Sequence, residues 1–175
     1  ASENELLFND ASESESTGIE VSDLSVNNTL IRNTSSHNDG TGIEVADEVG
    51  SGSGTVIERN SANNNKTYGI HVPKVSHTIT GNTANDNGTW GIWASEGSNN
   101  RVNVDGGGNK AQGNLGPLDP LSLKPLQCYS VRCDGTSAPS DLISPNTAMS
   151  TRPARSFSAL PRPKWTRGSL LAFTT

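Results

Sequence analysis

Carboxylates, an imidazole and an indole stand at corresponding positions along the chain, where together they could bind or process a sugar. Glu20, Glu44, His71 and Trp93 are each flanked by apolar residues, in the segments IEV, IEV, IHV and IWA. Side chains alternate between the two faces of a β-strand, so these four point away from the apolar residues on either side. We therefore expect them on the outer surface of one wall.

Two further rows accompany these four residues. Three positions earlier stand Thr17, Thr41, Tyr68 and Trp90, and three positions later stand Asp23, Asp47, Lys74 and Glu96. Aromatic rings pack on the apolar faces of sugar rings, while carboxylates and imidazole offer hydrogen bonds, calcium ligands or proton transfer. The sequence thus predicts an exposed sugar-binding wall made of Tyr68, Trp90, Trp93, Glu20 and Asp47.

Proton transfer at this wall would fall to Glu44, His71 and Lys74. A lyase or epimerase acting on a uronan needs a base at C5 and a cation that neutralises the carboxylate, and these three side chains offer both. No pattern of His residues predicts a metal site, and calcium is the one cofactor that such a wall could use. The alternative is a polar outer wall that only faces water.

A repeat positions these residues. Asparagines at Asn9, Asn33, Asn60, Asn82 and Asn109 are separated by 24, 27, 22 and 27 residues. Five residues after each of these asparagines stands a second Asn, or Ser14 in the first copy. Two residues after each stands a small residue, Ala or Ser. Gly and Ile follow at nine and ten, and the Ile column consists of Ile19, Ile43, Ile70 and Ile92. Units of this length cannot bury an apolar face alone, so a repeat of this period indicates a solenoid.

The solenoid predicted here is all-β, a single-stranded parallel β-helix of about four to five coils. The repeats lack the leucines of a leucine-rich repeat, and short period-2 segments fit β-strands. Stacked coils would bury the Ile column, a column of Val21, Val45, Val72 and Ala94, and a third of Leu30, Ile57 and Ile79. The Asn columns are expected at strand ends, where Asn tolerates the left-handed conformation, and the Gly column where positive φ or close packing is needed.

Composition agrees with a thin β core rather than a thick globular one. Only 31% of the 175 residues are apolar, and Gly occurs 18 times. Residues 1–134 carry 17 acidic and 8 basic side chains, which argues against a nucleic-acid partner. No apolar run reaches the length of a membrane span. We expect a monomer that is secreted or periplasmic, with polysaccharide as its partner.

The repeat weakens after Asn109, where Gly106, Gly107 and Gly108 replace the apolar approach. We expect repeats over 1–115, a C-terminal cap over 116–135, and a basic, disordered tail over 136–175 that could also be a segment of other origin. Cys128 and Cys133 lie in the cap. Two cysteines are too few for a zinc site, so the alternatives are a small disulfide-closed loop and two free thiols.

The pattern N-x-A-x-x-N-x-x-x-G-I-x-V over about residues 4–134 resembles the right-handed parallel β-helix repeat family of the pectate-lyase-like superfamily. That resemblance implies a right-handed parallel β-helix. The superfamily includes polysaccharide lyases, epimerases and periplasmic proteins of metal maturation. The matching residues are scaffold residues, and the chain has neither an Asp-Pro-His triplet nor an Asp cluster with a downstream Arg. Three functions therefore stay open: a polysaccharide-binding or polysaccharide-processing protein, a structural or adhesive solenoid, and a metal-maturation module.

Overall fold

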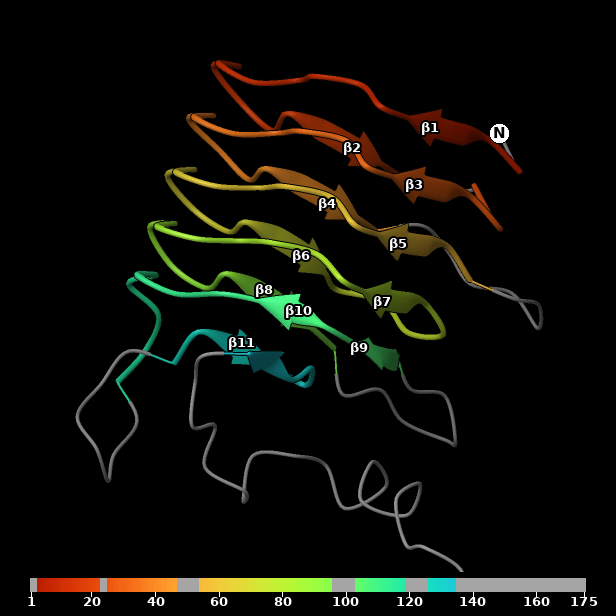
Figure 1. The fold of residues 1–175 in the computed structure, drawn as a ribbon. Coiled ribbons are helices and arrows are strands. Elements are labelled where there is room, and N and C mark those ends of the chain that lie inside the picture. The colour runs from red at the N-terminus through yellow and green to blue at the C-terminus, as the bar shows by residue number, and fades with distance from the viewer. Residues whose placement is uncertain (1–2, 23–24, 47–53, 96–102, 119–125, 135–175) are drawn as a thin grey trace, which may run out of the picture.

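The computed structural model describes residues 3–22, 25–46, 54–95, 103–118 and 126–134, and these form a parallel β-solenoid (Figure 1). Sheet A contains, in spatial order, β1 (Glu5–Leu7), β3 (Thr29–Ile31), β5 (Val56–Glu58), β7 (Thr78–Thr80) and β9 (Val104–Gly107). Sheet B contains β11 (Cys128–Tyr129), β8 (Ile92–Ala94), β6 (Ile70–Val72), β4 (Ile43–Val45) and β2 (Ile19–Val21). The prediction of a parallel β-helix is confirmed.

A third side of the solenoid is formed by single parallel bridges rather than full strands. The bridges join Asp10, Thr34, Ser61, Thr83 and Lys110 in neighbouring coils. At the C-terminal end the same side becomes a short ladder, in which β10 (Asn109–Lys110) pairs with β12 (Cys133–Asp134). Each coil therefore passes through three sides before it returns one level further along the axis.

The predicted apolar columns form the core. The Ile column is in register from Ile19 to Ile92 along sheet B, and Leu30, Ile57 and Ile79 are in register along sheet A. Leu30 and the Ile residues from Ile43 onward are completely buried. Neighbouring strands lie about 4.8 Å apart, so each core side chain packs on its equivalents above and below.

Two rows of asparagines, all buried except Asn9, hold successive coils together. Where an Asn also stands in the preceding coil, the Oδ1 atom accepts hydrogen bonds from both the backbone N–H and the side-chain Nδ2 of that residue, whereas Asn38 Oδ1 accepts from Ser14 N. For example, Asn60 Oδ1 lies 2.9 Å from both Asn33 N and Asn33 Nδ2. The first row is Asn9, Asn33, Asn60, Asn82 and Asn109, and the second is Asn38, Asn65, Asn87 and Asn114.

The expectation that these asparagines adopt the left-handed conformation is wrong. The residue immediately before each Asn adopts it instead, for example Arg59 with φ 53° before Asn60 and Asn64 with φ 55° before Asn65. The Asn that follows keeps a negative φ, and its side-chain amide bonds to the adjacent coil. The Gly column is explained by close packing rather than by positive φ, because a Cβ on Gly42 would lie 2.6 Å from Asn65 Nδ2.

A third polar row was not anticipated. His77 is fully buried and takes the place that Asn4, Asn28 and Thr55 occupy in earlier coils. The backbone N–H of Thr55 donates to His77 Nδ1 at 3.1 Å, and His77 N donates to Asn103 Oδ1 at 3.0 Å. The imidazole therefore acts as an acceptor within the scaffold.

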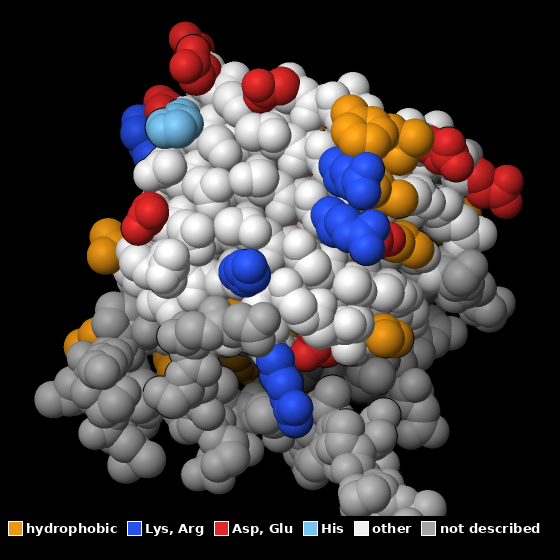
Figure 2. Space-filling view, viewed as in Figure 1, with side chains coloured by type: hydrophobic (Ala, Val, Ile, Leu, Met, Phe, Trp, Pro, Cys, Tyr) orange, Lys and Arg blue, Asp and Glu red, His pale blue; other side chains and the backbone are white. Residues whose placement is uncertain are grey.

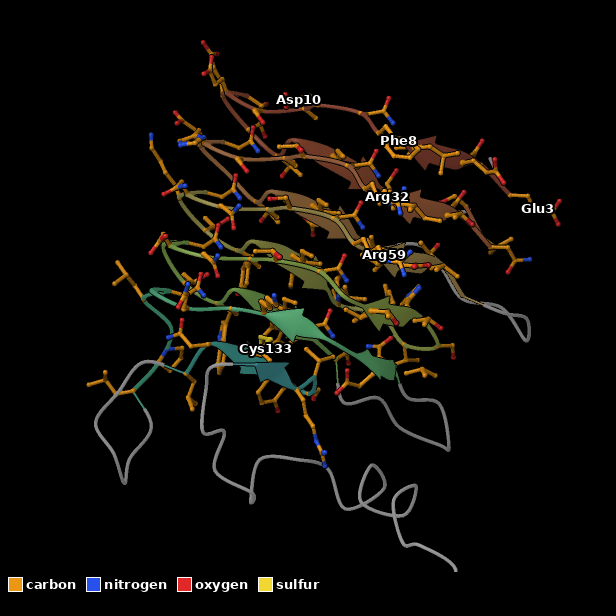
Figure 3. The ribbon with its side chains drawn as sticks, in the orientation of Figure 1. Glu3, Phe8, Asp10, Arg32, Arg59 and Cys133 are labelled. Atoms are coloured by element: carbon orange, nitrogen blue, oxygen red, sulfur yellow. A yellow bond between two sulfur atoms is a disulfide. The ribbon has the colours of Figure 1, made fainter. Side chains whose placement is uncertain are left out.

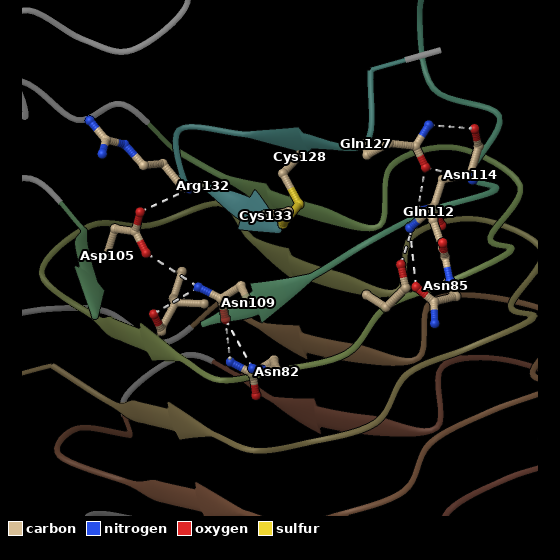
Figure 4. The surroundings of a disulfide bond; sticks show 12 residues. Asn82, Asn85, Asp105, Asn109, Gln112, Asn114, Gln127, Cys128, Arg132 and Cys133 are labelled. Atoms are coloured by element: carbon tan, nitrogen blue, oxygen red, sulfur yellow. Dashed lines mark hydrogen bonds between the residues drawn. A yellow bond between two sulfur atoms is a disulfide. The ribbon is translucent and has the colours of Figure 1, made fainter. Parts of the chain in front are cut away.

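Residues 126–134 continue the solenoid beyond the last complete coil (Figure 4). Cys128 stands in the Ile column next to Ile92, Cys133 pairs in register with Asn109, and a disulfide joins the two cysteines. This confirms the disulfide over two free thiols. The Gln127 side chain ends the second Asn row, because its Oε1 accepts from Asn114 N at 2.8 Å. Residues 136–175, predicted as the tail, lie outside the described residues.

Candidate functional site

One outward-facing column runs along sheet B and gathers half of the predicted site residues. Each member stands in the register position next to its neighbour, in adjacent strands β2, β4, β6, β8 and β11. The sheet B column consists of Glu20, Glu44, His71, Trp93 and Tyr129. It begins with an exposed carboxylate and ends with half-buried aromatic rings. The alternation of buried and outward positions on the three-residue strands places the first four on the outer surface, and Tyr129 joins them through its pairing with Trp93.

Four aromatic rings contact one another along this surface. The phenol ring of Tyr68 stacks on the imidazole of His71, with centroids 4.4 Å apart and planes 12° from parallel. His71 contacts Trp93 at 5.0 Å, and Trp93 stacks on Tyr129 at 5.8 Å. One face of the Tyr68 ring and one face of the Trp93 indole are therefore occupied within the protein.

Glu44 and His71 form an acid–base pair in adjacent coils. His71 Nδ1 lies 3.3 Å from Glu44 Oε1, and both side chains are mostly buried. Burial lowers the pKa of His71 from its ordinary value of 6.5, and the neighbouring Glu44 opposes this by raising it. The imidazole is therefore neutral at neutral pH, and the carboxylate can orient it through Nδ1. A neutral, oriented imidazole can accept a proton from a bound hydroxyl or C–H group.

The pH behaviour of this pair gives a testable prediction. Replacing Glu44 with glutamine should lower the pKa of His71 further, because the anion that favours the imidazolium is lost. An NMR titration of the imidazole Cε1–H signals of wild type and Glu44→Gln would measure this shift.

The same pKa shift affects stability with a definite sign. Because the folded pKa of His71 is lowered, the unfolded chain binds the proton more readily than the folded chain. The free energy of unfolding should therefore decrease as the pH falls below about 6.5, and the loss should level off below the folded pKa. A midpoint for His71 above 6.5, or no response to Glu44→Gln, would contradict this account.

The other predicted residues have different positions. Trp90, expected on the exposed wall, is only 8% exposed, because it packs edge-on against Tyr129 with ring centroids 5.6 Å apart. That expectation is wrong: Trp90 is buried and packs against Tyr129, a member of the sheet B column. Lys74 is exposed beyond the end of β6, and its carbonyl accepts a hydrogen bond from Asn103 Nδ2. Among the described residues, the sheet B column contains one ion pair, between Glu44 and His71. Asp47 lies outside the described residues.

Tyr129 was missed because a long segment separates it from the repeat. By the spacing of earlier coils, the residue after Asn109 that continues the Ile column would be Asp119, whereas Cys128 occupies that place. Because of these nine additional residues, the repeat spacing does not align Cys128 and Tyr129 with Ile92 and Trp93. The signal that was available is the short pattern Gln-Cys-Tyr, in which an apolar residue precedes an aromatic one as Ile92 precedes Trp93.

The family model described as "Right handed beta helix region" matches residues 1–107. The chain belongs to this right-handed β-helix family. No curated protein and no solved structure matches the chain significantly. For a β-helix protein the family determines the scaffold, and the outer columns determine the function. No helix in the described ranges is long and apolar enough to cross a membrane, and no group of three or more His, Cys, Asp or Glu side chains there could hold a metal ion.

Proposed function

We propose that this β-helix protein binds a linear polysaccharide along the sheet B column. The observation that carries the proposal is the in-register alignment of polar and aromatic side chains, one from each coil, along the solenoid axis. Coils repeat about every 4.8 Å, so a polymer of similar repeat lying along the axis would meet one protein side chain per sugar. Trp93 and Tyr129 would pack on sugar rings, and Glu20 and Glu44 would accept hydrogen bonds from hydroxyl groups.

The charge of the column indicates which sugars fit. Glu20 and Glu44 lie next to each other in register and are both acidic. A neutral sugar or an amino sugar would meet them favourably, whereas a uronan would be repelled unless calcium bridged the two sets of carboxylates. We therefore place a neutral or amino-sugar polymer first and a calcium-bridged uronan second.

Catalysis at this site would use the Glu44–His71 pair. Glu44 would orient the imidazole, and the Nε2 atom of His71 would exchange the proton with the substrate. Lys74, predicted as the cationic group of the site, lies in the segment that follows β6, and its role remains a prediction. Activity that persists in Glu44→Gln and His71→Ala would rule out this pair as the proton-transfer groups.

A disulfide of this kind supports a location outside the reducing cytosol. Cys128 and Cys133 are joined in the structure, and such bonds persist mainly in secreted and periplasmic proteins. We propose that the protein acts in one of these compartments. This fits a polysaccharide ligand.

Replacing the two outward-facing aromatic residues, Trp93 and Tyr129, should weaken glycan binding. We expect Trp93→Ala and Tyr129→Ala each to lower affinity about tenfold, because each ring contact contributes on the order of 1 kcal/mol and more when desolvated. Binding would be measured by calorimetry with chitosan, xylan, cello-oligosaccharides, polygalacturonate and alginate, with and without calcium. Release of unsaturated uronates would be followed in the same samples.

Phe8→Ala is the matched control for this experiment. Phe8 is 67% exposed and lies at the end of β1 in sheet A, away from the column on sheet B. It should leave glycan binding unchanged. If Trp93→Ala and Tyr129→Ala bind every glycan as the wild type does, or if no glycan binds, the column is not a sugar site. The structural or adhesive function would then be favoured.

A further inference from the structure

A second surface lies at the ends of the sheet A strands. The residue after β1 is Phe8, the residue after β3 is Arg32, and the residue after β5 is Arg59. They stand in register, because the backbone N–H of each donates to the carbonyl of the last strand residue in the next coil. Figure 3 shows these three labelled residues one above another along the edge of the solenoid. In later coils the same position is Gly81 and Gly108.

The backbone at this position disfavours the side chains that occupy it. Phe8, Arg32 and Arg59 have φ values of 57°, 55° and 53°, in the left-handed region that favours glycine. The second left-handed column contains Glu13, His37, Asn64 and Asp86, and the last three are residue types that tolerate this conformation better. Three bulky side chains in unfavourable backbone, where the later coils use glycine, indicate that the side chains themselves have a role.

These side chains form an exposed surface of mixed character. Phe8 is 67% exposed and Leu7 beside it is 40% exposed. The Arg32 guanidinium lies 5.5 Å from the centroid of the Phe8 ring, and Arg59 Nη1 lies 2.7 Å from Glu58 Oε1. Figure 2 shows two basic side chains directly beside a group of hydrophobic ones on this face. Exposed aromatic residues and arginines are the types that contribute most at protein interfaces.

The size and charge of this surface limit what can cover it. Strands of three residues stacked about 4.8 Å apart give an area on the order of a few hundred Å², well below the roughly 800 Å² per partner of a stable dimer. A second copy of the chain is therefore disfavoured. Residues 135–175 carry one acidic and five basic side chains, so this segment would be repelled by the arginines. A short acidic segment meets both constraints.

We propose that the surface formed by Leu7, Phe8, Arg32 and Arg59 binds an acidic peptide segment of another protein. A carboxylate of the segment displaces Glu58 from the Arg59 guanidinium, and a second carboxylate pairs with Arg32. An apolar side chain of the segment packs against Phe8 and Leu7. This site is separate from the sheet B column and does not depend on the polysaccharide proposal.

The test uses the full chain and a defined probe. A fluorescein-labelled peptide, Glu-Glu-Leu-Phe-Glu-Glu, is titrated at low ionic strength and followed by anisotropy, with Lys-Lys-Leu-Phe-Lys-Lys as the basic counterpart. The variant is Arg32→Gly/Arg59→Gly, because glycine already occupies this backbone position at Gly81 and Gly108. We expect saturable binding of the acidic peptide only, and an affinity about tenfold or more lower in the variant.

Controls separate this site from general charge effects and from unfolding. Lys66→Ala/Lys110→Ala removes two exposed positive charges from other positions and should bind the acidic peptide as the wild type does. Thermal unfolding should show that Arg32→Gly/Arg59→Gly keeps its fold. The proposal is overturned if the acidic peptide does not bind, if both double variants bind equally, or if polygalacturonate binds at the arginines while the peptide does not.

Discussion

Replacing Ile70 with aspartate should abolish the folded solenoid. Ile70 is fully buried, and in the core it lies between Ile43 and Ile92, its register neighbours. An unpaired carboxylate in such a stack costs several kcal/mol or more, which approaches the total stability of about 5–15 kcal/mol of a typical domain. Because each coil contacts only its neighbours, a break at β6 also separates the coils on either side. Circular dichroism and urea titration would detect the loss of the cooperative transition.

Val104→Asp is the matched control for this change. Val104 is also an apolar strand residue, in β9, but it is 53% exposed. Its replacement should change the free energy of unfolding by no more than about 1 kcal/mol. If Ile70→Asp unfolds cooperatively at the same urea concentration as the wild type, the stacked core described here is incorrect.

Replacing Asn60 with leucine should also destabilise the protein strongly, although leucine is more hydrophobic. Asn60 Oδ1 accepts two hydrogen bonds from Asn33, and Asn60 Nδ2 donates to Leu30 O at 2.9 Å and to Asn82 Oδ1 at 3.1 Å. Leucine removes the acceptor of the buried Asn33 N–H and takes one hydrogen bond each from Asn33 Nδ2, Leu30 O and Asn82 Oδ1. Each unsatisfied group costs about 1–3 kcal/mol, so we expect a loss on the order of 3–5 kcal/mol after relaxation.

The first coil offers a control in the same column. Asn9 is exposed, and its Nδ2 donates to Asn33 Oδ1 at 3.0 Å. Asn9→Leu should therefore cost only about 1 kcal/mol. Both free energies would be measured by denaturant unfolding. Equal losses at the two positions would mean that the asparagine rows fill space and do not connect the coils.

The repeat made the fold predictable because it encodes register directly. Residues at the same place in each repeat must stack, so the columns of Ile70 and Ile57 could be identified before any coordinates. The same logic found the outward positions of Glu44, His71 and Trp93. It failed where different side chains meet the same physical need. His77 belongs to a row with Asn28 and Thr55, since each accepts a hydrogen bond from a backbone N–H, and this equivalence does not appear in a hydrophobic pattern.

The remaining errors concern contacts that no repeat encodes. Trp90 is buried because Tyr129 covers it, and Tyr129 reaches that position only through the extra residues before β11. The residue before each Asn of the two rows adopts the left-handed conformation, and the Asn itself does not, because its amide must reach the next coil. A scaffold pattern also does not encode which ligand, if any, an outer surface binds, because the repeated residues are the buried ones.

The asparagine rows have a common direction, and this gives the solenoid an electrical polarity. In every link the N–H groups point toward the C-terminal coil and the Oδ1 atoms point toward the N-terminal coil. Aligned amides add as peptide dipoles do in a helix, with the positive end here at the C-terminus of the row. Asp105 stands at that end and accepts a hydrogen bond from Asn109 Nδ2 at 3.3 Å. If further coils extended the row, its new last Asn would again need a carboxylate or carbonyl acceptor for its side-chain Nδ2.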